Sequence, residues 1–188
     1  MSKQTVSVSR FTRLIHPMPA FLVTCAGEDG RPNAIAIAWL TPVSVNPPLL
    51  AFAIRPQRYS YELLQENPAF VVNVMAYERA VEVLFCGRCS GRDVNKFATA
   101  NLTPVPAQAV NAPAIAEALA HVECEVEAEY PAGDHVIVVG RVMAASAEEG
   151  MLVEGLRDLM AAPPLFHLGG SCFTTSSGEI SEPDVGLD

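Results

Sequence analysis

Three basic side chains and one serine are spaced so that they could bind a phosphate group. Arg55 and Arg58 lie just before Ser60, which the spacing predicts as the N-cap of a short helix. A helix N-terminus offers free backbone N–H groups and a partial positive charge, and arginines beside it add charge-assisted hydrogen bonds. Lys96, farther along the chain, could add another cation. The residues leave open the alternative of an ordinary cap among ordinary surface charges.

An aromatic side chain beside a break in a strand could bind a planar ligand. Trp39, the only tryptophan, lies near the end of an apolar run that begins at Asn33 and is typical of a strand packed on both faces. Thr41 and Pro42 interrupt this run, so backbone N–H groups there could face a ligand instead of a neighbouring strand. A planar heterocycle would suit such a place. The alternative is that Trp39 belongs to the core and that the strand simply ends.

Histidine could contribute to the same chemistry. His135 follows a Gly-Asp turn at the start of a predicted strand, where it could line a pocket and donate a proton or a hydrogen bond. It could equally be a turn residue that faces solvent. His16 and His167 leave the same choice open.

Cys86 and Cys89 form a Cys-x-x-Cys pair, a pattern found in redox dithiols and in half of a zinc site. A zinc site needs about four ligands, and no second pair of this kind follows in the sequence. A thioredoxin-like dithiol would need a βαβ context, which is also missing. We therefore expect no metal and interpret the pair as two thiols in a loop, at 86–92, close to the ligand.

Composition limits the partners and the location. The formal net charge of -9 argues against nucleic acid or an anionic membrane as a partner. Residues 1–11 are polar and contain no apolar core of a signal peptide, and the longest apolar stretch, 34–40, is too short to span a bilayer. Five cysteines, an odd number, fit a reducing compartment. We expect a cytoplasmic protein.

The elements that must position these side chains are mostly strands. Apolar runs at 20–26, 33–40, 49–54 and 69–75 alternate with turns, which the 15 prolines and 12 glycines supply. The clearest pattern covers 121–130, where four glutamates are predicted to share one solvated face and apolar residues the other. The run at 135–144 returns as its hairpin partner.

The predicted fold is mainly β with short helices. About six or seven strands joined mostly by hairpins indicate an antiparallel barrel with helical insertions, including short helices at 78–85, 93–99 and 154–160. No Gly-x-Gly-x-x-Gly turn supports a doubly wound parallel sheet. We expect one domain over 1–175 and a polar tail over 176–188.

The chain resembles the flavin reductase-like, flavoredoxin-type proteins, which have an FMN-binding split β-barrel with Greek-key connections. The resemblance covers about 16–173, and it lies in the order and spacing of several segments more than in any one of them. These segments are 19–24, Asn33-Ala34-x-Ala36-x-Ala38-Trp39, 43–49, Phe70-Val71-Val72-Asn73-Val74, Cys86-Gly87-x-x-Ser90-Gly91-Arg92-Asp93-Val94-Asn95-Lys96-Phe97, the Glu123-Cys124 strand and Gly133-Asp134-His135. Cys89 departs from the family's pattern and leaves thiol chemistry open in that loop.

The resemblance implies a homodimer with FMN near the subunit interface. It implies that Arg58, Ser60 and Lys96 hold the phosphate, that the backbone of 39–41 meets the ring edge, and that His135 tunes or orients the ring. The full implied set of cofactor-binding residues is Asn33, Trp39, Leu40, Thr41, Arg58, Tyr59, Ser60, Ser90, Lys96, His135 and Phe166.

Three functional hypotheses follow from the resemblance. The first is an oxidoreductase in which NADH or NADPH delivers hydride to FMN, which passes electrons onward. The second is an FMN-binding electron carrier, reduced by a partner protein that docks on the acidic surface. The third is a barrel that has lost FMN and binds another small molecule or serves as a structural protein.

Overall fold

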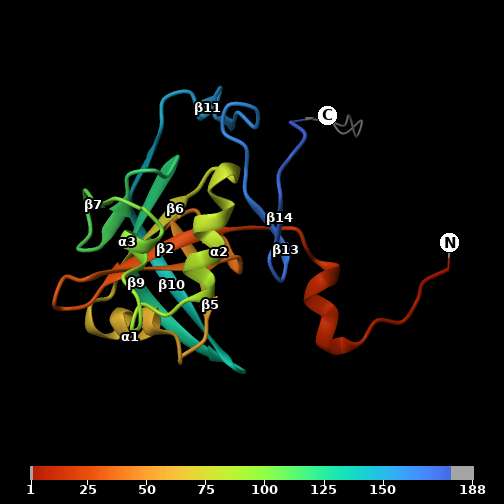
Figure 1. The fold of residues 1–188 in the computed structure, drawn as a ribbon, viewed down its shortest axis with the longest axis horizontal. Coiled ribbons are helices and arrows are strands. Elements are labelled where there is room, and N and C mark those ends of the chain that lie inside the picture. Colours follow the sequence, from red (N-terminus) through yellow and green to blue (C-terminus); the bar gives the residue numbers. More distant parts are fainter. Residues whose placement is uncertain (1, 179–188) are drawn as a thin grey trace.

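The computed structural model describes residues 2–178, and a seven-stranded antiparallel sheet dominates them (Figure 1). In spatial order the strands are β3 (Pro32–Ile37), β2 (Phe21–Ala26), β6 (Ala69–Val74), β9 (Ala120–Ala132), β10 (His135–Ala147), β5 (Leu49–Ile54) and β4 (Leu40–Ser44). Only two residues join β3 to β4, yet these strands lie at opposite ends of the sheet. The sheet must therefore curl until its two ends approach each other. The prediction of a mainly β, antiparallel barrel is confirmed.

Five helices and several short strands lie outside this seven-stranded sheet in residues 2–178. The helices are η1 (Val8–Leu14), α1 (Tyr59–Glu66), η2 (Tyr77–Arg79), α2 (Ala80–Arg88) and α3 (Lys96–Thr99). The short strands are β1 (Met18–Pro19) with β13 (Phe166–Gly169) and β14 (Cys172–Thr174), β7 (Pro104–Pro106) with β8 (Pro113–Ile115), and β11 (Leu152–Val153) with β12 (Leu156–Arg157). Figure 1 shows η1 standing away from the barrel. None of the helices in 2–178 is long and apolar enough to cross a membrane. Most of the predicted tail, 179–188, lies outside the described residues.

Two buried apolar clusters, one on each face of β2, explain the continuous apolar sequence of this strand and of β3. Inside the barrel, Val23, Phe52 and Phe70 belong to one buried cluster. On the opposite face of β2, Leu22 belongs to a second cluster, which α2 closes with Val83. Because β2 and β3 are covered on both faces, they contain continuous apolar sequence instead of an alternating pattern.

Two sequence predictions about local structure are wrong. Thr41 and Pro42 lie inside β4 and pair with β5, and the break comes earlier, at 38–39. Pro42 is tolerated because β4 is an edge strand. The helix predicted at 154–160 is absent, because Glu154 and Gly155 have positive φ and form the two-residue turn between β11 and β12.

The glutamate-rich face of β9 is only partly solvated. Glu125 and Glu127 are exposed, whereas Glu123 is buried and accepts hydrogen bonds from the backbone N–H groups of Gln108 and Ala109. Its carboxylate thus anchors the loop before β8 to the sheet.

Close packing inside the barrel yields a test of the fold. A Cβ added at Gly140 on β10 would lie 2.4 Å from Cζ of Phe70, whose ring packs against Phe52 with centroids 5.2 Å apart. We expect Gly140→Ala to lower the free energy of unfolding by about 1–3 kcal/mol in urea denaturation, because the core must shift. Met143→Ala, at a 44% exposed position of the same strand, should change it by less than about 0.5 kcal/mol. Equal stability of Gly140→Ala and the unaltered protein would contradict this packing.

Candidate functional site

Three adjoining pockets lie between β3, the turn before α1 and the end of α2. The lysine pocket, of about 160 Å³, includes Asn33, Ser60 and Lys96. The aromatic pocket, of about 320 Å³, includes Trp39, His16, His135 and His167. The arginine pocket, of about 670 Å³, includes Arg13, Arg55 and Arg88. Arg58 and Gly87 line all three, so the pockets form one continuous hollow.

Lys96 is the chemically most unusual residue of the lysine pocket. Only 5% of it is exposed, and its Nζ donates to the carbonyls of Ala34, at 2.7 Å, and Cys86, at 2.8 Å. Ala34 lies on the edge strand β3, and Cys86 lies in the last turn of α2, at the negative end of the helix dipole. Burial lowers the pKa of Lys96. Within 2–178 no carboxylate pairs with this ammonium, which keeps a third N–H donor for the pocket.

A second buried polar group also faces this pocket. The Nδ2 group of Asn33 donates to Ser60 Oγ at 2.8 Å, while its Oδ1 atom is buried and has no partner among the described residues. The backbone of Gly91 approaches so closely that a Cβ there would lie 2.1 Å from this Oδ1. A buried acceptor without a donor is costly, so a ligand donor that reached this atom would relieve that cost.

The first turn of α1 forms the outer wall of the lysine pocket. The predicted N-cap is wrong: Arg58 is the N-cap, without a side-chain cap bond, and Ser60 lies in the first turn with its hydroxyl turned inward to Asn33. The ring of Tyr59 lies between two guanidinium groups, Arg31 at 5.7 Å and Arg92 at 5.0 Å from its centroid. The guanidinium of Arg58 forms no hydrogen bond to any described residue and remains available to a ligand.

Four side chains in successive contact, Trp39, His135, Asp134 and Arg55, lie at one side of the aromatic pocket. The rings of Trp39 and His135 lie 5.1 Å apart, and His135 Nδ1 lies 2.6 Å from Asp134 Oδ1. Asp134 also pairs with Arg55 at 2.9 Å. The hydrogen bond to His135 and the Arg55 charge lower the pKa of Asp134. The carboxylate therefore holds the proton on Nδ1 and leaves Nε2 of His135 to face other groups.

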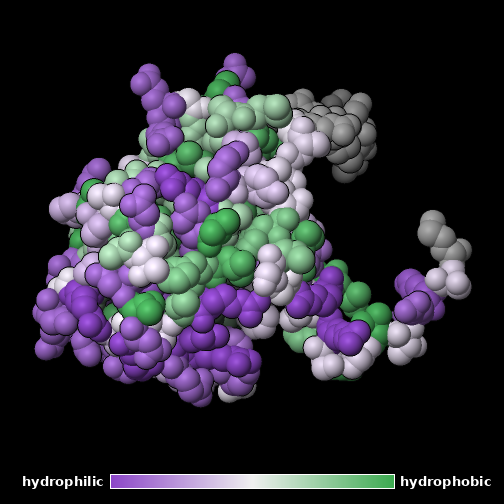
Figure 2. Space-filling model, viewed as in Figure 1, coloured by the Kyte–Doolittle hydropathy of each residue, from purple (hydrophilic) through white to green (hydrophobic). Residues whose placement is uncertain are grey.

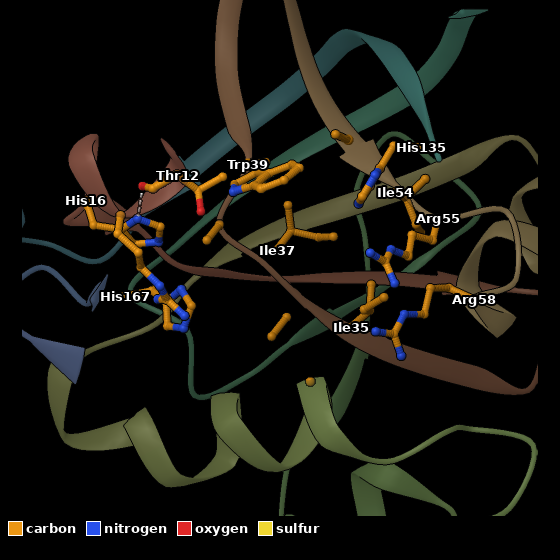
Figure 3. Close-up of a pocket in the computed structure, with 15 residues that line it drawn as sticks. Thr12, His16, Ile35, Ile37, Trp39, Ile54, Arg55, Arg58, His135 and His167 are labelled. Atoms are coloured by element: carbon orange, nitrogen blue, oxygen red, sulfur yellow. Dashed lines mark hydrogen bonds between the residues drawn. The ribbon is translucent and has the colours of Figure 1, made fainter. Parts of the chain in front are cut away.

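Two further histidines lie across the pocket. The rings of His16 and His167 are 5.5 Å apart, and burial lowers the pKa of His167. Figure 3 shows these two rings on one side and His135 with the two arginines on the other, with Trp39 and Ile37 between them. The pocket thus combines aromatic and apolar walls with hydrogen-bonding groups at two edges.

The structure gathers eight of the eleven predicted site residues. Six line the lysine pocket and two line the aromatic pocket: Asn33, Arg58, Tyr59, Ser60, Ser90 and Lys96, and Trp39 and His135. Leu40 and Thr41 do not line the pockets, because they pair with Phe52 and Ala51 of β5. Phe166 pairs with Pro19, and its neighbour His167 lines the pocket instead.

Sequence reasoning did not identify Thr12, Arg13 and Arg88 as residues of the site. Arg13 lies on η1 and belongs to no motif, whereas Arg88 lies near the end of α2, inside the Cys-x-x-Cys pair that was interpreted only through its thiols. His16, whose role the sequence left open, lines the aromatic pocket together with Thr12. Only the fold brings Arg13 and Arg88 to the same pocket.

The cysteines near the site are mostly unreactive. Burial raises the pKa of Cys25 to about 12 and that of Cys86 to about 11. Cys86 lies in α2, which extends to Arg88, so the loop predicted at 86–92 begins only at Cys89. Cys89 is half-buried and lines the lysine pocket. No group of three potential metal ligands occurs in the described part of the chain.

Comparison with known sequences identifies relatives of this chain. Residues 12–175 match a sequence profile described as a flavin reductase like domain. An NADH-dependent FAD reductase of Streptomyces globisporus is 32% identical over 151 residues, which are 78% of this chain and 81% of that one.

Solved structures agree with this match. Flavoredoxin of Desulfovibrio vulgaris superposes with a TM-score of 0.88 at 27% identity and covers 100% of both chains. An FMN-binding protein of Thermus thermophilus, solved with bound 1-cyclohex-2-enone, superposes with a TM-score of 0.85 at 26% identity and covers 97% of this chain and 99% of its own. The predicted split barrel is confirmed by these neighbours.

The buried ammonium yields a pH test. Because the pKa of Lys96 is lowered in the folded state, the unfolded chain, with a pKa near the ordinary 10.5, binds the proton more readily. The resulting penalty is complete below the lowered pKa and disappears as the pH rises through it toward 10.5. Without ligand, we expect the unfolding free energy of the unaltered protein to rise over this range relative to Lys96→Met, measured by urea denaturation. Lys3→Met, at an exposed lysine, should show no such change. A pH-independent difference for Lys96→Met would contradict the assignment.

Proposed function

Because the chain belongs to the flavin reductase-like family, we propose that it binds FMN and transfers electrons from a nicotinamide cofactor to this flavin in the cytoplasm. The observation that carries the proposal is the buried Lys96, which has no carboxylate partner in 2–178 and lines a pocket that opens into the aromatic pocket. Five free cysteines are compatible with a reducing compartment.

The lysine pocket suits a phosphate group. Lys96 Nζ, the guanidinium of Arg58 and the first N–H groups of α1 are all donors, and the oxygens of a phosphate dianion are all acceptors. Ser60 Oγ already accepts from Asn33, so its own O–H is free to donate. The unpartnered Oδ1 of Asn33 would accept from a hydroxyl of the ribityl chain.

The aromatic pocket suits the flavin ring. Trp39, Ile35 and Ile37 supply apolar surface, and the histidines supply hydrogen-bonding groups at the edges. When bound, FMN supplies the redox chemistry, by accepting hydride from NAD(P)H and passing electrons to an acceptor. Asp134 fixes the ring of His135, which we assign as a residue that orients or tunes the flavin.

A second candidate function is an electron carrier that a redox protein reduces. The superposition with flavoredoxin favours it, as does the exposed Glu125 on β9, to which a basic partner could dock, whereas its neighbour Glu127 is paired with Arg141.

An absorption experiment separates these functions. We expect the purified protein, incubated with excess FMN and desalted, to retain flavin bands that bleach when NADH or NADPH is added without oxygen. Bands that persist with both nicotinamides but bleach with dithionite would favour the carrier. Absence of retained flavin would contradict both functions.

We also propose a homodimer with FMN near its interface. On η1, Val8 is 86% exposed and Leu14 is 68% exposed, and Val45 after β4 is 93% exposed. Figure 1 shows η1 projecting from the barrel, and Figure 2 shows apolar atoms exposed on this projecting segment. A second copy of the chain would cover this surface, and the segment also contributes Thr12 and His16 to the aromatic pocket.

The dimer is tested by a charge on η1. We expect Leu14→Asp to shift the protein from dimer to monomer in sedimentation equilibrium and to weaken FMN binding, because the N-terminal wall of the pocket loses its support. Leu152→Asp, at a 56% exposed leucine on the β11–β12 hairpin, should leave the dimer intact. A monomeric unaltered protein, or an intact dimer in Leu14→Asp, would overturn this proposal.

A further inference from the structure

The arginine pocket concentrates positive charge in an acidic chain. Four of the ten arginines line it, although the net charge of the chain is -9. Of these four, Arg55 alone pairs with a carboxylate among the described residues, that of Asp134. The floor of the pocket consists of small residues, with Ala36, Ala38 and Gly87. The four arginines are Arg13, Arg55, Arg58 and Arg88.

Two of these arginines are held by the turn between β13 and β14. Arg13 Nη1 donates to the carbonyl of Leu168 at 3.1 Å, and Arg88 Nη2 donates to Ser171 Oγ at 2.9 Å. A Cβ at Gly169 would lie 0.9 Å from Arg13 Nη1, so the guanidinium lies directly against this glycine. Neutral acceptors thus fix the two side chains without cancelling their charge, and each guanidinium keeps further donors.

The charge of these arginines reaches the pocket wall. His167 lines both the aromatic and the arginine pocket, and its pKa is lowered by burial and further by the charges of His16, Arg13 and Arg88, against a hydrogen bond to Gly170 that raises it. The charges of Arg13 and Arg88 thus act at the pocket wall, where they oppose a further positive charge on His167.

One anion is already assigned to the lysine pocket, where Lys96 and Arg58 lie. Arg13 and Arg88 lie outside the lysine pocket and pair with no carboxylate among residues 2–178, so they are available to a second polyanion. A nicotinamide donor must bind beside the flavin ring, and the arginine pocket opens into the aromatic pocket. NADPH carries a 2′-phosphate that NADH lacks.

We propose that the arginine pocket binds the phosphates of the nicotinamide donor and that Arg13 and Arg88 bind the 2′-phosphate, so that the protein prefers NADPH to NADH. The assignment rests on the proposed function, because the aromatic pocket must hold the flavin. The 2′-phosphate would receive charge-assisted hydrogen bonds from two guanidinium groups that the β13–β14 turn holds in place.

The test uses fragments that cannot transfer hydride. The full chain, incubated with excess FMN, is titrated calorimetrically at low salt with 2′,5′-ADP and with 5′-AMP, which differ only in the 2′-phosphate. We expect 2′,5′-ADP to bind at least about tenfold more tightly, because its 2′-phosphate would accept charge-assisted hydrogen bonds from the two guanidinium groups. Arg88→Gln and Arg13→Gln should each remove most of this preference, and Arg88→Gln, at a residue that does not line the aromatic pocket, should leave FMN affinity unchanged.

Arg10→Gln is the matched control. Arg10 lies on η1 with Arg13 but does not line the arginine pocket, and this substitution removes the same charge as Arg13→Gln. Equal binding of the two fragments, or a preference that survives Arg88→Gln, would overturn the proposal. If Arg13→Gln fails to fold because the packing of Arg13 against Gly169 is lost, Arg88→Gln alone tests the proposal. An arginine-dependent preference in a protein that neither NADPH nor NADH reduces would uphold this site while rejecting the reductase function. Flavin reduction without any 2′-phosphate preference would do the reverse.

Discussion

The burial of the Lys96 ammonium is the constraint on which the rest of the site depends. Removing an ammonium from water carries a large penalty unless other groups compensate for it. Here the compensation within the chain is partial and consists of two carbonyls, one on the edge strand β3 and one at the C-terminal end of α2. These two contacts explain why α2 packs across β3 with small residues between them, and they leave part of the charge for a ligand in the lysine pocket.

The architecture around this lysine assigns the phosphate and the flavin ring of the proposed cofactor to two different pockets. Lys96, Arg58 and the first turn of α1 surround a small polar pocket, whereas Trp39 and His135 line a larger apolar one beside it. The barrel supplies rigid walls for both, because β2 and β3 are packed on two faces. The N-terminal segment and the β13–β14 hairpin complete the pockets, and Arg13 links them through its hydrogen bond to Leu168.

The sequence predicted the sheet and much of the lysine pocket for identifiable reasons. Apolar runs and turns located the strands, and helix-start chemistry located Arg58 near a helix N-terminus, although the cap itself was misplaced by two residues. Arg13 and Leu168 are 155 positions apart, and no local pattern connects them. Thr41 was misassigned because proline reads as a strand break, while an edge strand tolerates it. The residue types suggested Lys96 as an additional cation beside Arg58, and the family resemblance assigned both residues to the phosphate.

The most direct test of the account compares FMN with riboflavin, which lacks only the phosphate, by equilibrium dialysis against the unaltered protein and Lys96→Met. If Lys96 is a phosphate-binding residue, the unaltered protein should bind FMN at least about a hundredfold more tightly than riboflavin, and most of this difference should disappear in Lys96→Met. Riboflavin binding as tight as that of FMN, or a phosphate preference that persists in Lys96→Met, would contradict the central role of this lysine.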